Sequence, residues 1–277
     1  MAFSINTNAG AFIALQNLNA TNTGLAKTQN AINTGLKVSS AKDNAAVFAI
    51  AQNLRSNVSG LNAVKQSLDR ALGAVDVAMA AGQAVSDLLV EMKEKAVAAA
   101  DAGQDTASRK ALNDDFVQLR DQIKTIVDNA TFNGINAVKA SGQNIVGITD
   151  DQGTSAGALT ITAQNLSLGG TNVTIAANAT ISTAAGARTA VNAIETSIKN
   201  VNAALSKLGS GAKRLEMQKV FVNKLSDTIE TGIGNLVDAD LAKESAKLQA
   251  LQVKQQLGLQ ALSIANQQPS SVLALFR

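Results

Sequence analysis

The sequence predicts a mainly α protein, a long antiparallel helical bundle or coiled coil with a small central β-hairpin region. Three observations carry this prediction. Apolar residues step by three or four over long stretches, as they do on one face of a helix. Much of the 46% hydrophobic content is alanine, aromatic residues make up 3%, and proline occurs once, a composition that favours long helices. In the middle of the chain the apolar spacing changes to alternation, which is typical of strands.

The longest helical ladder runs from Leu54 to Ala96, and shorter ones cover 112–126, 191–215 and 222–229. Narrow apolar stripes with alanine-rich flanks favour closely packed, bundled helices over ordinary globular ones. A serine followed three residues later by an acidic residue is a helix-start signal. The segment Ser40–Asp43 therefore predicts the start of the first long helix.

The central segment 152–187 carries no charged side chain. Two runs in it, 159–161 and 173–175, alternate apolar residues with threonine, and Leu-Gly-Gly-Thr at 168–171 separates them. We therefore expect these two runs to pair as a hairpin or small sheet.

The two ends of the chain, 1–26 and 255–276, also carry no charge, yet their apolar residues recur at roughly seven-residue intervals. Burying such a seam in a single pairing does not offset the entropy cost of ordering its backbone, so we expect the terminal helices to order only within an assembly. A hairpin of the two ends inside one monomer is the alternative. The predicted polymerisation seam comprises Ile5, Phe12, Leu18, Leu25, Ile32, Leu241, Leu248, Leu251, Leu259 and Leu262.

The single proline lies close to the end of the chain and precedes an apolar tail. Proline lacks a backbone N–H and disfavours helical geometry at the preceding residue. We therefore predict that the inner helix stops near Asn266 and that the tail packs as a separate anchor, so that deleting 270–277 leaves a soluble monomer unable to polymerise. This stop and anchor comprise Pro269, Val272, Leu273, Leu275, Phe276 and Arg277.

Histidine, cysteine, tyrosine and tryptophan are all absent, which excludes triad-type hydrolysis, histidine zinc sites and aromatic stacking on nucleic acid. We expect no catalytic residue, metal or cofactor. A net charge of +3 without a basic run gives no reason to expect nucleic acid, and no apolar run is long enough to predict membrane insertion. The glycine-rich LGSGAKR at 208–214 keeps helical register and indicates a locally bent helix rather than a phosphate loop.

Four segments occur in a diagnostic order: INTN at 5–8, NTGLKVSSAKDNAA followed after two residues by AIA at 33–51, TFNG at 131–134, and ANQ with the following P, VL, L and R at 265–277. Together they resemble the hallmark segments of bacterial flagellins, over roughly 1–140 and 187–277. The resemblance implies a non-enzymatic structural subunit of the helical filament used for swimming. It also implies that the chain is exported unfolded by the flagellar type III system, is secreted, and is located in the extracellular filament.

The resemblance further implies three domains. Residues 1–36 with 237–277 would form an inner coiled coil that lines the filament tube, with the terminal helices paired in the filament core. Residues 37–140 with 187–236 would form an outer helical bundle, and 141–186 a short central β-hairpin and surface region.

The partners implied by the resemblance are other copies of the chain, the export apparatus, a secretion chaperone, the filament cap and the hook-junction proteins. A hook–filament junction protein is an alternative of the same class. A helical signalling module or a lyase-type all-helical enzyme is an alternative from another class. The first of these would need a membrane span or adaptation sites, and the second a catalytic loop; neither is visible in the sequence.

Two departures from the family pattern have consequences. Val47 and Phe48 stand where many flagellins have a small residue followed by a polar or aliphatic one, so we expect different packing there. In the segment 89–99, Glu91 and Lys95 replace the arginine and leucine of the pattern that the animal toll-like receptor for flagellin senses, so we expect weak or no receptor activation.

The central segment is rich in hydroxyl side chains, and many flagellins carry O-linked sugars. A simple strand-forming role for each threonine is the alternative. The candidate O-glycosylation sites are Thr154, Ser155, Thr160, Thr162, Ser167, Thr171, Thr174, Thr180, Ser182 and Thr183.

Overall fold

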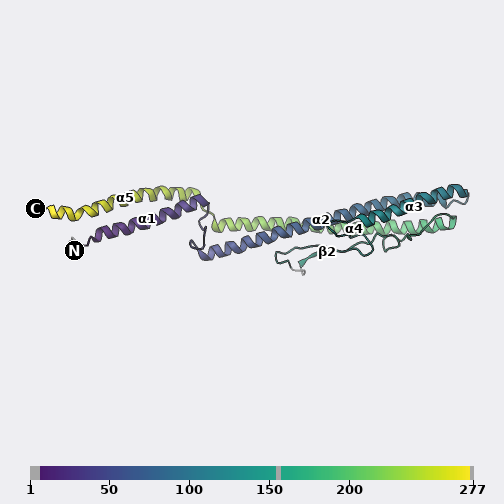
Figure 1. Cartoon of the computed structure of the whole chain (residues 1–277), viewed down its shortest axis with the longest axis horizontal. Coiled ribbons are helices and arrows are strands. Elements are labelled where there is room, and N and C mark those ends of the chain that lie inside the picture. The colour runs from purple at the N-terminus through teal and green to yellow at the C-terminus, as the bar shows by residue number, and fades with distance from the viewer. Residues whose placement is uncertain (1–6, 154–156, 275–277) are drawn as a thin grey trace. The chain divides into compact units, whose positions relative to one another are not determined.

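The structure is a computed structural model that describes residues 7–153 and 157–274, with side chains described as far as Gln267. Within these residues the chain forms long helices and one short two-stranded sheet (Figure 1), which confirms the predicted fold class. The elements are α1 (Ala9–Thr34), α2 (Ala45–Ala99), α3 (Thr106–Asn129), β1 (Ile145–Gly147), β2 (Leu159–Ile161), α4 (Ala184–Val237) and α5 (Leu241–Ala274).

The chain divides into two compact units, Met1–Ser56 with Thr228–Arg277, and Asn57–Asp227. Helices α2 and α4 each contribute to both units. The division into three domains expected from the family resemblance stays a prediction.

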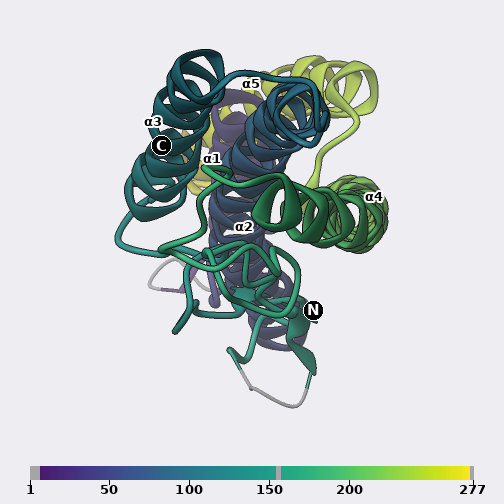
Figure 2. The ribbon, with the colours of Figure 1, turned by 90° about the vertical axis from the view of Figure 1, so that its right-hand side faces the viewer.

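In the unit Asn57–Asp227, helices α2, α3 and α4 pack around one apolar core (Figure 2). Ion pairs at its rim join Lys93 to Glu195 at 2.8 Å and Lys95 to Asp115 at 3.0 Å. A stretch of α2 has the length and hydropathy of a membrane span, but 39% of it is buried within the protein, as in the core helix of a bundle. The core residues come from the predicted ladders and include Leu68, Val75, Val85, Leu89, Met92, Phe116, Ile123, Ile194, Val201, Leu208 and Leu215.

The central sheet pairs β1 with β2 in antiparallel register, with Ile145 opposite Ile161. The prediction that 159–161 pairs with 173–175 is therefore wrong. The backbone and side chains of 173–175 are engaged elsewhere: the amide N–H of Thr174 donates to Ser197 Oγ of α4 at 2.9 Å, and the flanking Val173 and Ile175 side chains are fully buried. Packing against the helical core therefore determines the position of this run.

Helix α4 continues without interruption through 208–214. Gly211 is buried beneath β2, and a Cβ atom added there would lie 2.7 Å from Cδ1 and 2.9 Å from Cγ1 of Ile161. The glycine therefore allows the strand to approach the helix closely. Neither a phosphate loop nor a bend is needed to explain it.

The unit that contains both termini has a junction where the chain leaves α1. Gly35 ends the helix in the left-handed region, at φ 71°, a conformation that glycine adopts without strain. The following residues run beside the end of α4, where Lys37 N–H donates to Val237 O at 2.7 Å and Ala239 N–H to Gly35 O at 2.8 Å. These backbone bonds fix the start of α5 next to the end of α1.

A small apolar cluster of Val38, Ala51 and Val237 covers this junction. Val47 and Phe48, the two residues that depart from the family pattern, pack against this cluster. Their side chains therefore contribute to the apolar packing of the junction, and the expectation that this packing differs from that of other flagellins stays a prediction.

Helix α2 begins at Ala45, after Asn44, whose Oδ1 accepts the N–H of Val47 at 3.2 Å. The prediction that Ser40 starts the helix is wrong. Asp43 Oδ2 instead accepts four hydrogen bonds, from the N–H and hydroxyl groups of Ser39 and Ser40, at 3.0–3.2 Å. The Ser39 hydroxyl contributes most to lowering the pKa of Asp43 below its ordinary value. The carboxylate thus holds a turn ahead of the helix.

Two glycines of α4 test the close packing beneath β2. We expect Gly211→Ala to lower the free energy of unfolding by about 1–3 kcal/mol, because the added methyl group overlaps the buried Ile161 side chain. Gly209→Ala, whose added Cβ would meet no atom within 4 Å, should raise the free energy of unfolding by up to about 1 kcal/mol through helix propensity alone. Thermal unfolding followed by far-ultraviolet circular dichroism measures both, and equal shifts in the same direction would contradict the close approach.

Candidate assembly interface

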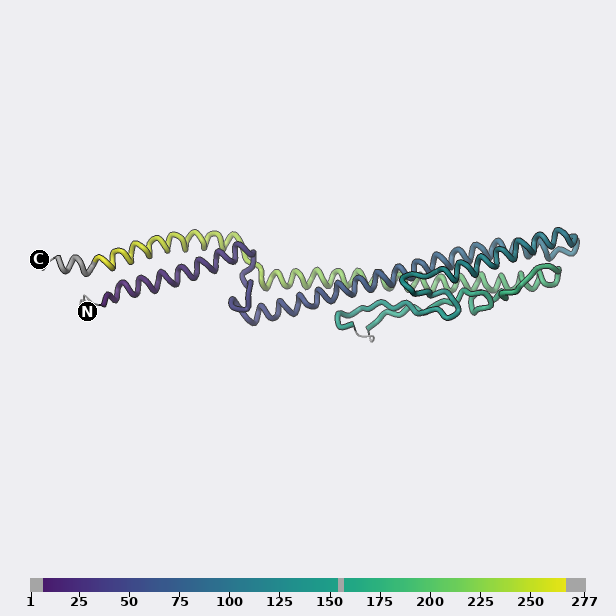
Figure 3. Tube along the Cα trace, in the orientation of Figure 1, coloured from purple at the N-terminus to yellow at the C-terminus, as the bar shows by residue number. Residues whose placement is uncertain are grey.

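Helices α1 and α5 lie side by side in the unit that contains both termini, with the start of α1 and the end of α5 at the same end of the pair (Figure 3). Buried and half-buried residues recur on α1 at 11, 14, 18, 21, 25, 28 and 32, and on α5 at 244, 248, 251, 255, 258, 262 and 265. Steps that alternate between three and four define a coiled-coil seam. The two ends therefore form a helical hairpin within one chain, which is the alternative to the expectation that they order only within an assembly.

Leucine side chains in this seam pack into gaps left by glycines. A Cβ atom added at Gly258 would lie 3.4 Å from Leu18 Cδ1, and one added at Gly24 would lie 3.7 Å from Leu251 Cδ1. Thr28 is fully buried in the same seam, and its hydroxyl has no hydrogen-bond partner. The glycines, one on each helix, let α1 and α5 pack close together over a narrow contact surface.

The hairpin covers only part of the predicted seam. Leu18 is buried, and Leu25, Ile32, Leu248, Leu251 and Leu262 are half-buried. Ile5 lies outside the described residues. Three members are exposed on the hairpin surface: Phe12 (66%), Leu241 (50%) and Leu259 (53%).

Phe12 and Leu259 fall outside the seam for a geometric reason, whereas Leu241 lies on the seven-residue line through Leu248 but is the first residue of α5. The step from Phe12 to Leu18 is six residues, so the seven-residue line through Leu18 passes through Ala11. On α5, Gly258 continues the line from Leu251, and Leu259 lies one residue beyond it. The sequence prediction considered only large apolar residues and so missed Ala11 and Gly258. Their exact seven-residue spacing from Leu18 and Leu251 is the only signal that they belong to the seam.

A second apolar stripe runs along α5 on the side away from α1. Val253, Leu257 and Ile264 are 56%, 58% and 70% exposed. Spacings of four and seven place them on one face of the helix, and that face lies opposite the seam. Phe12 and Ile13 similarly point outward from α1. Large apolar side chains that recur on one exposed helix face make this face a candidate interaction site.

Polar side chains contribute to the hairpin through amides rather than charges. Gln255 Nε2 donates to Asn22 Oδ1 at 2.7 Å, and Asn8 Nδ2 donates to the backbone carbonyl of Ala265 at 2.6 Å. Among the described residues no ion pair joins α1 to α5; Glu244 bonds Lys247 on its own helix.

The prediction that Pro269 stops the helix is wrong, because α5 continues through it to Ala274. Proline removes the N–H that would bond the carbonyl four residues earlier, which is that of Ala265. This carbonyl accepts the Asn8 side chain instead, so the loss is compensated and the helix continues. The side chains from Pro269 through Leu273 lie outside the described ones, as do residues 275–277, so the anchor stays a prediction.

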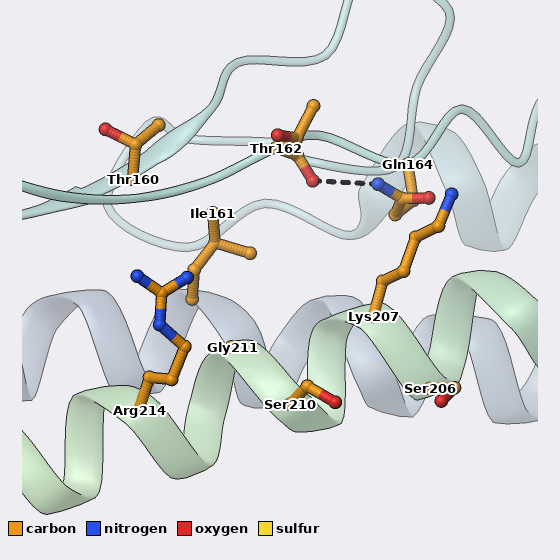
Figure 4. Close-up of a pocket in the computed structure, with 9 residues that line it drawn as sticks. All are labelled: Thr160, Ile161, Thr162, Gln164, Ser206, Lys207, Ser210, Gly211 and Arg214. Carbon is orange, nitrogen blue, oxygen red and sulfur yellow. Dashed lines mark hydrogen bonds between the residues drawn. The ribbon is translucent and has the colours of Figure 1, made fainter.

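A groove of about 320 Å³ lies between β2 and α4 (Figure 4). Lys207 and Arg214 extend from α4 toward the strand, which presents Thr160 and Thr162. The charged residues that line the groove are Lys207 and Arg214, so it presents positive charge beside β2.

The candidate glycosylation residues differ in whether their hydroxyls are available. Thr154 and Ser155 lie outside the described residues, and Ser167 is half-buried. Thr174 Oγ1 donates to Ala193 O at 3.0 Å, and Thr183 Oγ1 accepts the N–H of Gly186 at 3.1 Å. The candidates with exposed side chains are Thr160, Thr162, Thr171, Thr174, Thr180, Ser182 and Thr183.

The segment 89–99 lies on α2, with Leu89 fully buried and Glu91 exposed. Lys95 reaches across to α3, where its ammonium group bonds Asp115 at 3.0 Å. This bond is the main reason that the pKa of Lys95 is raised above its ordinary value. The surface of this segment therefore presents an acidic residue beside an ion-paired lysine.

Comparisons with known proteins identify the family of the chain. The model of the bacterial flagellin N-terminal helical region matches residues 5–142, and that of the bacterial flagellin C-terminal helical region matches residues 191–276. Flagellin FljM of Caulobacter vibrioides is 50% identical over 274 residues, which cover 99% of this chain and 98% of that one.

A flagellin of Brucella melitensis is 36% identical over 283 residues, covering 99% of each chain. The crystal structure of Bacillus cereus flagellin superposes with a TM-score of 0.49 at 22% sequence identity, over 56% of this chain and 87% of that one. The two family matches span both charged and neutral helical segments, and the relatives extend over the whole length. The chain therefore belongs to the bacterial flagellin family.

Proposed function

We propose that this flagellin polymerises through the hairpin of α1 and α5, which assembly stabilises by covering its exposed apolar surface. Its family makes it a structural subunit of the helical bacterial flagellar filament, which serves swimming, and favours this role over a hook–filament junction protein or a signalling module. The observation that carries the proposal is the apolar stripe of Val253, Leu257 and Ile264, which the hairpin leaves exposed.

Covering that stripe requires other copies of the chain. The pairing with α1 already uses the opposite face of α5, so a further helix has to pack on the outer side. Contacts that repeat from copy to copy without closing a ring produce an open helical filament. We infer that seam residues exposed on the hairpin, Phe12, Leu241 and Leu259, also contact neighbouring subunits. The C-terminal tail would extend the same contacts.

The family resemblance supports the remaining partners. We propose that the chain leaves the cell unfolded through the flagellar type III apparatus, that a secretion chaperone holds its C-terminal segment, and that it joins an extracellular filament between hook-junction proteins and a cap. The proposed domains are the inner coiled coil of 1–36 with 237–277, the outer bundle of 37–140 with 187–236, and the surface region 141–186.

Substituting the outer stripe tests the assembly mechanism. Leu257→Gln combined with Ile264→Gln should raise the monomer concentration that remains in equilibrium with filaments at least tenfold, because each apolar side chain contributes about 1.5–3 kcal/mol when fully buried. Sedimentation and electron microscopy of the purified protein measure this. Leu257→Met with Ile264→Val keeps the stripe apolar and should assemble nearly as the natural chain does. Normal filaments from the glutamine variant would refute the role of the stripe.

We also propose that the toll-like receptor for flagellin responds weakly or not at all to this chain. Glu91 is exposed and Lys95 is held by Asp115, in positions where the recognised pattern has arginine and leucine. A reporter-cell assay with purified monomer should show little signal, and Glu91→Arg with Lys95→Leu should increase it. A strong response to the natural sequence would overturn this proposal.

O-glycosylation is proposed for the central segment, chiefly at Thr160, Thr162, Thr171, Thr180 and Ser182, whose side chains are exposed. Intact-mass measurement of native filaments should show additions in multiples of one sugar mass, and peptide mapping should place them in 157–183. A mass equal to that of the bare chain would leave these residues in the alternative, purely structural role.

A further inference from the structure

Asn8 joins the two ends of the chain through both atoms of its side-chain amide. Its Oδ1 accepts the backbone N–H of Ala11 at 3.1 Å and so caps the start of α1. Its Nδ2 donates to the backbone carbonyl of Ala265 on α5 at 2.6 Å. Because one partner can only donate and the other can only accept, the orientation of the amide is determined by its neighbours.

The acceptor on α5 is unusual within its helix. In an α-helix each carbonyl accepts the N–H of the residue four positions later. For Ala265 that residue is Pro269, which has no backbone N–H. Pro269 is the only proline in the chain. Before the last turn of α5, the carbonyl of Ala265 is therefore the only one whose helical donor is missing because of the residue type.

We propose that Asn8 is a positioning residue that sets the register of α1 on α5, with its side-chain amide replacing the helical donor that Pro269 lacks. Because of the proline, the carbonyl of Ala265 accepts no helical hydrogen bond, and the side-chain amide of Asn8 donates one to it. A slip of the helices by one turn would bring the Asn8 amide to a carbonyl that already has a helical donor. The carbonyl of Ala265 would then be left without a hydrogen bond, which costs free energy where water is excluded.

The surroundings of the pair support a register function. Gly10 lies two residues after Asn8, and a Cβ atom added at Gly10 would lie 4.0 Å from Ala265 Cβ, so the two backbones approach closely here. At the other end of the hairpin, backbone bonds between Gly35 and Ala239 and between Lys37 and Val237 hold the helices together. Between these ends Leu18 packs against Gly258 and Leu251 against Gly24, but beyond Leu18 the seam of α1 holds only Ala11 and Ala14. Asn8 therefore fixes the relative position of α1 and α5 at the end of the hairpin that these backbone bonds do not reach.

A double-mutant cycle tests this directly. Asn8→Ser keeps a helix-capping oxygen but is too short to serve as the amide donor. Asn8→Asp also keeps the cap, has the shape of asparagine and has no N–H. Pro269→Ala returns a backbone N–H to the Ala265 carbonyl and makes the Asn8 amide redundant. The cycle therefore separates capping of α1 from pairing with α5.

In full-length protein grown from filament seeds, Asn8→Ser should raise the equilibrium monomer concentration about three- to tenfold, the effect of losing one hydrogen bond. Asn8→Asp should raise it at least as much. In the Pro269→Ala background Asn8→Ser should change it less than twofold. Equal effects in both backgrounds, or no effect of Asn8→Ser in the natural background, would overturn the proposal. For a variant that does not assemble alone, its share in filaments grown with excess natural subunits gives the same ratio.

This inference deepens the proposed assembly mechanism, so a second measurement is independent of filament growth. Hydrogen–deuterium exchange over residues 9–34 should be faster in Asn8→Ser and restored by adding Pro269→Ala. If the natural chain makes no filaments, the proposed function fails, while exchange rates that follow this cycle still support the role of Asn8. If filaments form but neither measurement shows coupling between Asn8 and Pro269, only the role of Asn8 fails.

Discussion

The two terminal helices carry more apolar surface than one helix pairing can cover, and this constraint governs the rest of the structure. Helices α1 and α5 carry apolar residues on more than one face, and a single pairing covers one face of each. Glycines at 24 and 258 make that pairing close but narrow, so much of the apolar surface stays outside it. Since apolar area exposed to water is a persistent free-energy cost, copies of the chain that cover one another's outer stripes are the stable arrangement.

The hairpin is held differently at its two ends. At the end nearest the long helices, backbone hydrogen bonds and the cluster of Val38, Ala51 and Val237 form a junction that resembles ordinary globular packing. At the other end the contacts are amides and small side chains. The free end therefore has fewer interactions to hold it than the junction does.

The helical part of the fold was predictable because apolar spacing repeats over many turns and survives local irregularities. The strand pairing was not, because 159–161 and 173–175 share the same alternation and only the hydroxyl of Ser197 and the helical core decide which run joins a sheet. Small residues caused the errors at the interface. Ala11 and Gly258 occupy seam positions that a search for large apolar residues assigns to Phe12 and Leu259.

Proline was the other instructive case. Its local chemistry argues correctly for a missing hydrogen bond, but a residue 261 positions earlier in the chain supplies the donor. A contact between the two ends of a chain has no signature in either local segment. The prediction that Ser40 starts a helix was wrong for a local reason. Asp43 bonds both Ser39 and Ser40 and so forms a turn where a helix start was expected.

The terminal hairpin, finally, is held by methyl groups, backbone and amides, with no ion pair between its helices among the described residues. Dissolved salt weakens attraction between exposed charges within about 8–10 Å at physiological concentrations, but it leaves apolar packing largely intact. Contacts made through this hairpin should therefore keep their strength when a swimming cell passes from fresh water into brine, whereas the exposed ion pairs at the rim of the bundle of α2, α3 and α4 should weaken.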